Sequence, residues 1–253
     1  MFIPSKLYHS ACQFTCDVSV PDSFGVLCWN VHKNNTRQSR FKSYLKTIET
    51  QFDFMLLQEA NFRNDEHFAL PHFAYDAAAN LEIRKSFYGV LTASRVKSTK
   101  AEAYLSQRKE SLIGPHKSLL VTRYSFEDKN PLFILNVHAI NFRENKGFNK
   151  ELERFLVLLE SQKGAMIVAG DFNTWNKQRL LKLHEMREIL GLKAVKNEGT
   201  QVKSFMGNPL DFIFYRGLEL EKSSVDHGHG LSDHNPLFAQ FRKINEDEEQ
   251  EQS

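Results

Sequence analysis

Short apolar runs alternate with amphipathic stretches along the chain from Phe24 onward. Runs of about four to eight apolar residues are typical of buried strands, and apolar residues three or four positions apart are typical of helices packed on a sheet. The runs predict strands at Phe24–Trp29, Phe54–Leu57, Lys117–Tyr124, Leu132–Val137, Ala165–Ala169, Phe212–Tyr215, Leu218–Val225 and Pro236–Phe241, with other short β-like runs between Ser86 and Arg123. The helical spacing predicts helices at Arg40–Thr50, Gly147–Gln162 and Lys177–Leu190. Many strands with two or three helices between them favour an α+β or α/β sandwich of packed sheets.

The chain is predicted to be one domain with a segment on either side. Its 253 residues suit one large domain, and no internal repeat or Pro/Gly/Ser-rich linker divides them. Residues 1–22 show no clean periodicity and are expected to be a leader before the fold that need not be ordered. Residues 23–243 are the expected domain, and residues 244–253 an acidic, disordered tail.

Hydropathy and cysteine content favour a cytoplasmic protein. No apolar run reaches the roughly 18 residues that a membrane span needs. The first residues lack the apolar core of a secretory signal. Cys12, Cys16 and Cys28 make an odd count, which favours reduced thiols. The expectation is therefore a cytoplasmic protein whose cysteines are reduced. The chain is also expected to be a monomer.

Polar residues stand where six of the apolar runs end or begin. Four predicted strands end in such a residue, at Trp29-Asn30, Gln58-Glu59, Val137-His138 and Gly170-Asp171-Phe172-Asn173. Two later strands are preceded by one, at Leu210-Asp211 and Ser232-Asp233-His234-Asn235. If the late strands run antiparallel to the early ones, all six clusters lie on a single rim of the sheets.

These clusters favour a metal site over a set of unrelated turns. An Asp or Asn after a strand is usually a turn former or a helix N-cap, and Asn30 or Asp171 taken singly fits that role. Six such breaks together fit it poorly, because carboxylates gathered on one rim repel each other and lose hydration. A divalent cation relieves both costs, and carboxylate and amide oxygens favour Mg²⁺ or Mn²⁺. Zn²⁺ is disfavoured because the clusters hold only two histidines, His138 and His234.

The same segments resemble the ordered motifs of the endonuclease/exonuclease/phosphatase (DNase I-like) superfamily. The motifs span residues 26–238 in family order, and Gly-Asp-Phe-Asn together with Ser-Asp-His is the most specific pair. The length of the chain and the segments at residues 138–142 and 211–217 are most similar to the small bacterial YafD-like branch. The resemblance implies a four-layer α/β/β/α sandwich. It also implies an Mg²⁺-dependent enzyme that hydrolyses phosphodiesters or phosphate monoesters.

The resemblance implies which residues hold the metal and the phosphate. Glu59 matches the main metal ligand, with Asn30 and Asp233 as its assistants. Lys117 stands just before a predicted strand, where related enzymes often place a basic residue near the scissile phosphate. A solvated lysine at a strand end explains Lys117 as well. Asn141 matches the family's segment around His138 and is a second candidate for contact with the phosphate.

The implied catalytic residues are two aspartates, one asparagine and two histidines. Asp171 and Asn173 match residues that hold the attacking water or the phosphate, and Asp211 is implied to fix the tautomer of His234 by a hydrogen bond. His138 falls where DNase I-like and sphingomyelinase-like members have a histidine and abasic-site endonucleases have a tyrosine. Cleavage needs a base for the water and a proton for the leaving oxygen. Asp171 and the Asp211–His234 pair are both candidates for the base, and His138 is the expected acid.

Net charge favours an anionic polymer as substrate. Five of the 31 acidic residues lie at residues 246–251, so the rest of the chain has 26 acidic residues against 33 basic ones, a net charge of +7. A basic body suits nucleic acid, and Lys177, Arg179, Lys182 and Arg187 on one predicted helix could follow its backbone. A lipid or small phosphoester of the sphingomyelin or inositol phosphate type remains the alternative. So does a scaffold of the same fold without catalysis.

Overall fold

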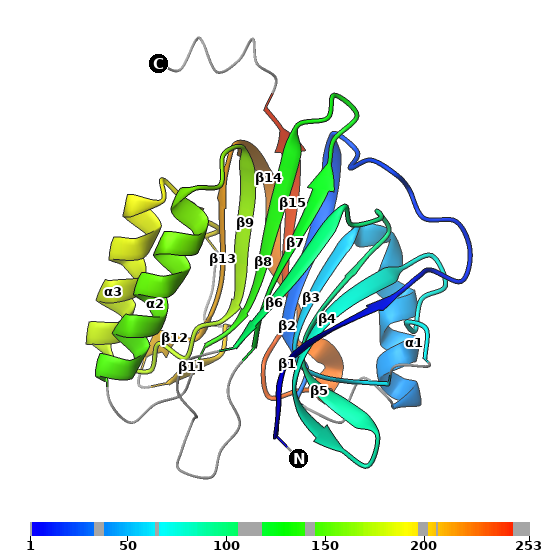
Figure 1. The fold of residues 1–253 in the computed structure, drawn as a ribbon, viewed down its shortest axis with the longest axis horizontal. Coiled ribbons are helices and arrows are strands. Elements are labelled where there is room, and N and C mark those ends of the chain that lie inside the picture. Colours follow the sequence, from blue (N-terminus) through cyan, green and yellow to red (C-terminus); the bar gives the residue numbers. More distant parts are fainter. Residues whose placement is uncertain are drawn as a thin grey trace.

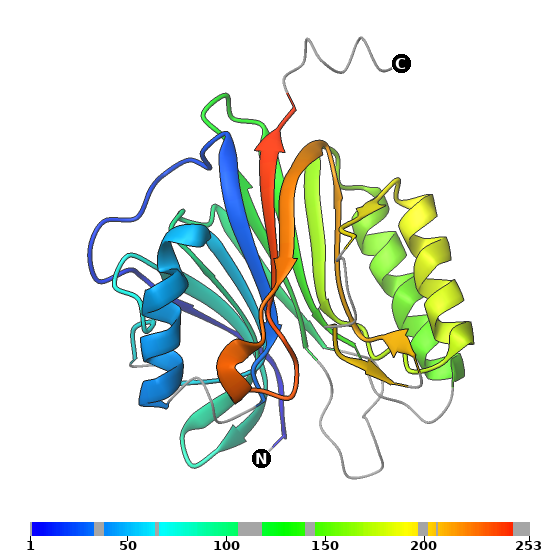
Figure 2. The same cartoon turned by 180° about the vertical axis from the view of Figure 1, so that it is seen from behind.

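Two β-sheets pack face to face, and helices cover the outer face of each sheet (Figure 1). This arrangement comes from a computed structural model, in which residues 2–32, 38–63, 66–105, 118–139, 145–196, 202–205 and 207–244 are described. Helix α1 (Ser39–Ile48) lies on the first sheet, and helices α2 (Asn145–Glu160) and α3 (Lys177–Ile189) lie on the second (Figure 1, Figure 2). The layers follow the order α/β/β/α, which confirms the expected four-layer sandwich.

Each large sheet mixes parallel and antiparallel strands. The first sheet has the order β1-β4-β5-β3-β2-β15-β14, and the second has the order β10-β13-β9-β8-β7-β6. The strands of the first sheet are β1 (Phe2–Ser10), β2 (Ser23–Asn30), β3 (Phe54–Phe62), β4 (Ala74–Ile83), β5 (Ser86–Ser94), β14 (Leu218–Val225) and β15 (Leu237–Lys243). Those of the second are β6 (Lys100–Leu105), β7 (Ser118–Ser125), β8 (Pro131–His138), β9 (Ala165–Asp171), β10 (Lys193–Ala194) and β13 (Asp211–Arg216). Strands β11 (Ser204–Phe205) and β12 (Asn208–Pro209) form a hairpin, and short 3-10 helices lie at Glu49–Gln51 and Gly228–Gly230.

Aromatic side chains fill the spaces between the layers. Outside the first sheet, the ring of Phe41 from α1 stacks on Trp29 with centroids 5.4 Å apart. Between the sheets, the ring of Phe54 lies 5.6 Å from Phe24 and 4.8 Å from Tyr124. Strands buried on both faces need apolar residues at nearly every position. That requirement explains why the predicted strands appear in the sequence as continuous apolar runs.

The N-terminal segment differs from the sequence expectation in two ways. Residues expected to form a leader instead include strand β1, which pairs antiparallel with β4 at the edge of the first sheet. Asp17 and Val20 also make parallel bridges to Val96 and Phe126. In addition, Cys12 and Cys16 form a disulfide, so the expectation of reduced thiols is wrong for this pair. Their short loop is exposed and brings the two thiols together, which the count of cysteines could not reveal.

Strand β4 was not expected, because its sequence is rich in alanine, a residue that favours helices. It is nonetheless a strand, since it pairs with both β1 and β5. The expected acidic tail lies outside the described residues beyond Ile244. Among the described residues, no helix has the length and apolar character needed to cross a membrane.

Candidate active site

The six polar clusters do meet at one end of the sandwich, the lower end in Figure 1. Strands β2 and β3 are parallel, and so are β8 and β9, so their carboxyl ends point the same way. Strand β13 is antiparallel to β9, and β15 is antiparallel to β2, which brings their starting residues to the same rim. The late strands therefore run antiparallel to the early ones, as the prediction of a single rim required.

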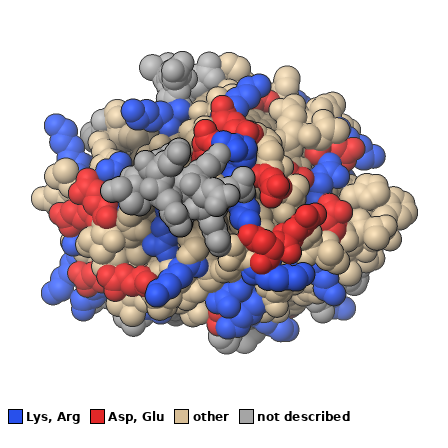
Figure 3. Space-filling model, turned by 90° about the horizontal axis from the view of Figure 1, so that it is seen from above, with Lys and Arg blue, Asp and Glu red and all other residues tan. Residues whose placement is uncertain are grey.

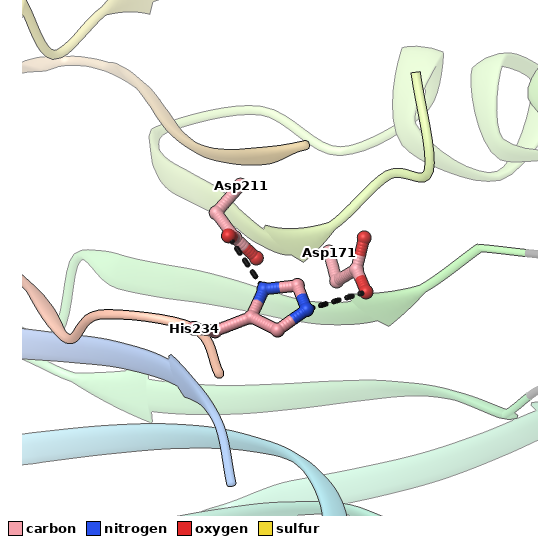
Figure 4. Close-up of side chains that lie close together, drawn as sticks. All are labelled: Asp171, Asp211 and His234. Atoms are coloured by element: carbon pink, nitrogen blue, oxygen red, sulfur yellow. Dashed lines mark hydrogen bonds and ion pairs between the residues drawn. The ribbon is translucent and has the colours of Figure 1, made fainter. Parts of the chain in front are cut away.

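His234 lies between two buried carboxylates (Figure 4). Its Nδ1 donates to Oδ2 of Asp211 at 2.7 Å, and its Nε2 lies 4.0 Å from Oδ2 of Asp171. Asp211 and Asp171 occupy directly paired positions on β13 and β9, which explains why both reach the same imidazole. The three residues expose 7%, 5% and 3% of their surface, so all three charges are largely removed from water. Their ligand atoms lie within 4.8 Å of one another and could also hold a metal ion.

The segment that carries His234 is docked on the end of β2. The indole nitrogen of Trp29 donates to the backbone oxygen of His234 at 2.8 Å. The hydroxyl of Ser232 donates to the backbone oxygen of Asn30 at 2.6 Å and accepts from the backbone nitrogen of His234 at 3.2 Å. These bonds fix the imidazole to the first sheet, whereas both of its carboxylate partners belong to the second. The site therefore spans both sheets.

Two asparagines hold the carboxylate of Asp171. Asn30 Nδ2 donates to Oδ2 of Asp171 at 3.0 Å, and the backbone nitrogen of Asn173 donates to Oδ1 at 2.9 Å. The Asn173 side chain donates in turn to the backbone oxygen of Ala139 at 2.9 Å. Gly170, just before Asp171, allows the end of β9 to approach β8 closely, because a Cβ at this position would lie 1.9 Å from the backbone oxygen of Val137. Both oxygens of Asp171 thus have fixed directions.

His138 and Glu59 complete the group on the far side of Asp171. His138 Nε2 lies 3.7 Å from Glu59 Oε1 and 3.8 Å from Asp171 Oδ2. Glu59 has a backbone φ of +54° and lies at a register shift between β3 and β5. A bulge of this kind redirects a side chain, and the left-handed backbone of a non-glycine residue costs about 1–3 kcal/mol. Such strain at Glu59 is typical of a functional position.

Burial and neighbouring charges shift the pKa values of this group. Burial, followed by repulsion from Asp211, raises the pKa of Asp171 to about 6, although His234 and the two amide hydrogen bonds oppose the rise. Burial also raises the pKa of Asp211, against the effect of His234. Burial alone would lower the pKa of His234, but the hydrogen bond to Asp211 and the nearby carboxylates raise it to about 9. At neutral pH the imidazole therefore carries a proton and partly neutralises the two aspartates.

Of the other residues named from the sequence, Asp233 stands apart from this group. The carboxylate of Asp233 contacts Lys203 Nζ at 3.0 Å and His32 Nδ1 at 3.7 Å, and its side chain is 55% exposed. Its position as a metal ligand beside Glu59 stays a prediction. Lys117 and Asn141 lie outside the described residues, and their contacts with phosphate also stay predictions.

Sequence reasoning gave no role to two buried amides beneath the site, although Gln58 stands in one of the polar clusters and Asn136 matches the family motif. Gln58 Nε2 donates to Asn136 Oδ1 at 2.8 Å, and Asn136 Nδ2 donates to the backbone oxygen of Leu91 at 3.0 Å. Gln58 and Asn136 are both fully buried and join β3 of the first sheet to β8 of the second. They therefore link the strand that carries Glu59 to the strand that ends at His138. The signal was present, since Gln58 and Asn136 are polar residues inside apolar runs.

Comparison with known proteins agrees with this geometry. Residues 27–234 match the sequence profile of the endonuclease/exonuclease/phosphatase family. The chain therefore belongs to this family and is a phosphoester hydrolase. The resemblance of the motifs to this superfamily is thus confirmed. Members of the family are typically dependent on a divalent metal, and the buried Asp171, Asp211 and His234 could bind one.

The bacterial relatives identify the branch of the family. A UPF0294 protein of Yersinia enterocolitica is 34% identical over 220 residues, which cover 86% of this chain and 83% of that one. A UPF0294 protein of Vibrio cholerae is 33% identical over 224 residues, which cover 87% and 78% of the two chains. These matches confirm the resemblance to the YafD-like branch.

Solved structures with low sequence identity share the fold. Humanized D. rerio TDP2 superposes with a TM-score of 0.68 at 16% identity, over 88% of this chain and all of that chain (100%). ANGEL2, described as a 2′,3′-cyclic phosphatase, superposes with a TM-score of 0.62 at 15% identity, over 95% of this chain and 98% of the other. They establish the DNase I-like architecture and leave the substrate open.

Proposed function

We propose that this chain is a divalent-metal-dependent phosphodiesterase that cleaves DNA or RNA. The observation that carries the proposal is the buried arrangement of His234 between Asp211 and Asp171, with His138 on the other side of Asp171. Such a group offers a carboxylate that can act as a base, a positively charged imidazole held in place, and a second imidazole close by. Hydrolysis of a phosphodiester uses all three. Water adds to phosphorus, the ester oxygen leaves, and one proton moves from the water to the leaving oxygen.

Asp171 is the better candidate for the base. Its pKa of about 6 is close to neutral pH, so the carboxylate is largely ionised there and still basic enough to accept a proton from water. His234, with its pKa near 9, holds its proton and stabilises negative charge on a phosphate oxygen. Asn173 then orients the water or the phosphate, and His138 protonates the leaving oxygen. A neutral His234 acting as base is the alternative. It predicts that activity rises with pH up to about 9, whereas Asp171 as base predicts a rise around pH 6.

The donor set fits a hard divalent cation, Mg²⁺ or Mn²⁺. Glu59 and Asp171 present carboxylate oxygens to the same nitrogen of His138, and the amide oxygen of Asn30 has a lone pair beyond the one used by the backbone nitrogen of His32. Oxygen donors of this kind suit Mg²⁺ and Mn²⁺. Glu59 and Asn30 are the proposed ligands, with Asp233 as a further candidate. The cation would polarise the phosphate and stabilise its developing charge.

Nucleic acid is supported by the net charge of +7 outside the acidic segment at 246–251 and by the histidine at position 138. A small phosphoester is the second candidate. Solved structures of the same fold include a Bacteroides thetaiotaomicron mannosyl-6-phosphatase at a TM-score of 0.60 and the 2′,3′-cyclic phosphatase ANGEL2. The expected helix surface for nucleic acid is reduced, because Arg179 is fully buried.

A substrate panel tests the proposal. Purified protein with Mg²⁺ or Mn²⁺ is incubated with plasmid DNA, single-stranded RNA, a generic phosphodiester and a set of phosphomonoesters. Cleavage of a nucleic acid whose KM rises steeply with salt supports the proposal, because bound phosphates release counterions. Selective hydrolysis of a small ester favours the second candidate. No hydrolysis by a folded protein that binds no Mn²⁺ in calorimetry favours a scaffold.

A cytoplasmic location and a monomeric state stay predictions. The disulfide between Cys12 and Cys16 weighs against the first, because disulfides persist mainly in oxidising compartments. Gel filtration coupled to light scattering tests the second.

A further inference from the structure

Arg179 is a fully buried arginine in the first turn of α3 (0% exposed). Its guanidinium lies between two aromatic rings, 4.6 Å from the ring of Trp175 and 4.8 Å from that of Phe148. The other basic residues of the helix behave differently. Lys182 pairs with Glu185 at 2.9 Å, and Arg187 pairs with Glu188 at 3.1 Å, as ordinary surface ion pairs. Arg179 alone of these three points into the protein.

The guanidinium ties the turn after Asp171 to the start of α2. Its NH1 nitrogen donates to the backbone oxygen of Asn173 at 3.0 Å, and its Nε donates to Asn145 Oδ1 at 3.3 Å. Asn176 closes the ring, because it donates to the same Asn145 oxygen at 2.9 Å and caps the backbone nitrogen of Arg179 at 3.0 Å. The turn is thereby held from beneath by a planar group with hydrogen bonds in two directions.

Asn173 connects Arg179 to Asp171, the proposed base. It adopts a left-handed backbone with φ of +50°, and its backbone nitrogen donates to Asp171 Oδ1 at 2.9 Å. One face of the same residue therefore contacts the proposed base, and its carbonyl contacts Arg179. Burying a guanidinium is costly unless it is well paired, and apolar residues of similar size often stabilise a fold as well or better. Stability alone is thus a weak reason for a charge in this place.

We infer that Arg179 is a positioning residue, which fixes the Asn173 turn so that Asp171 and Asn173 face the substrate phosphate. The inference rests on the proposed function of Asp171 and Asn173. Its contribution is to geometry. A shift of about 1 Å in a reacting group can cost on the order of 100-fold in rate. Lysine cannot replace arginine here, since an ammonium lacks the flat fork that reaches Asn173 and Asn145 while it stacks on both rings.

The test compares Arg179→Lys with Phe148→Leu. Phe148→Leu loosens the same pocket but retains the guanidinium and its hydrogen bonds. Leu181→Gln is the surface control, because Leu181 is 63% exposed on α3. For each variant, kcat and KM are measured on the best substrate of the panel with Mg²⁺, well below the melting temperatures, which are recorded in parallel. Arg179→Lys is expected to lower kcat about 10- to 100-fold with KM within about threefold of the parent. Phe148→Leu is expected to retain kcat within about threefold despite a lower melting temperature.

Several outcomes would overturn the inference. It fails if Arg179→Lys retains kcat within about threefold, or if Phe148→Leu loses as much kcat as Arg179→Lys at a similar melting temperature. If Arg179→Lys does not fold, Asn145→Ala takes its place, since it removes the acceptor of Nε and leaves the guanidinium. A kcat loss of about three- to tenfold with unchanged KM is then expected, and unchanged kcat overturns the inference. If the parent protein hydrolyses nothing in the panel, the proposed function fails instead.

Discussion

The two ends of the sandwich treat carboxylates in opposite ways. At the end seen in Figure 3, which is remote from the site, Lys and Arg side chains lie beside Asp and Glu side chains across the surface. Lys243 Nζ donates to the carboxylate of Asp128 in the β7–β8 turn, and that bond holds the pKa of Asp128 below the usual range. At the other end, Asp171 and Asp211 are buried and face His234, and burial raises the pKa of both.

This difference shows that the carboxylates of the site end destabilise the fold at neutral pH, whereas Asp128 at the far end stabilises it. A carboxylate whose pKa is lowered on folding stabilises the protein at neutral pH, and one whose pKa is raised destabilises it. Strand ends of similar geometry exist at both ends of the sheets. Within the part of the chain that the structure describes, two buried acids lie 4.0 Å or less from one imidazole at the site end alone, together with a strained Glu59. Unfavourable electrostatics that persist in a fold are a mark of a functional site.

The largest expected effect is on catalysis at the site end. His234→Ala removes the protonated imidazole between the two aspartates. The value of kcat/KM with Mg²⁺ is expected to fall by a factor of roughly 10² to 10⁴. Asp128→Asn at the opposite end should leave kcat/KM unchanged. Initial rates on the best substrate of the panel measure both. Similar losses in the two variants would mean that the contrast between the ends reflects stability alone.

Metal binding should also separate the two ends. Glu59→Gln retains the shape of the side chain but removes the charge of the main proposed ligand. Isothermal titration with Mn²⁺ is expected to show affinity weakened by at least about 10- to 100-fold, which is the typical loss when only a group that supports a metal ligand is removed. Glu221→Gln, an exposed acid that faces Arg242 at the far end, is the matched control and should bind Mn²⁺ like the parent. Equal binding by parent and Glu59→Gln would exclude Glu59 as a ligand.

The rim could be predicted from the sequence because each of its residues is tied to a strand end. Asn30, Glu59 and Asp171 directly follow or terminate apolar runs, and strand direction alone brings such ends together. The pairing of Asp211 with His234 came from the family resemblance, and the structure places the two 2.7 Å apart.

Features that depend on packing between distant segments could not be predicted. The sequence of strand β1 lacks a clear alternation of apolar and polar residues, and its position in the sheet follows from its pairing with β4. Arg179 looked like one of several surface cations, because its burial depends on rings supplied by α2 and by the turn after β9. Asp233 matched a ligand position by motif, yet its neighbour Lys203 comes from a loop about 30 residues away in the sequence. Helical or strand periodicity carries no record of such contacts.

Stability should respond with opposite sign at the two ends. The folded pKa of Asp171, about 6, exceeds its ordinary value of 3.8, so its ionisation destabilises the fold as pH rises through that window. In EDTA at pH 7, Asp171→Asn is expected to increase the free energy of unfolding by about 1–3 kcal/mol, with the gain vanishing below about pH 4.

Asp128→Asn should be slightly less stable than the parent at pH 7. The difference should disappear in acid, because the lowered pKa of Asp128 stabilises the fold only while the carboxylate is ionised. Urea unfolding across pH 3–8 measures both, and a stability loss in Asp171→Asn at pH 7 would contradict the comparison.

The smallest expected effect is at a surface pair of the far end. Glu219 and Arg242 form an ion pair across β14 and β15, with side chains 52% and 38% exposed. Exposed pairs contribute about 0–1 kcal/mol because water and salt screen them, and Arg242 also faces Glu221 at 3.8 Å. Glu219→Gln is therefore expected to change the free energy of unfolding by less than about 0.5 kcal/mol, and by still less in 0.5 M NaCl (about 4 Å screening length). Activity should be unchanged. A larger loss of stability that 0.5 M NaCl greatly reduces would mean that the charges of this end act as a network. The two ends would then differ less than their pKa values indicate.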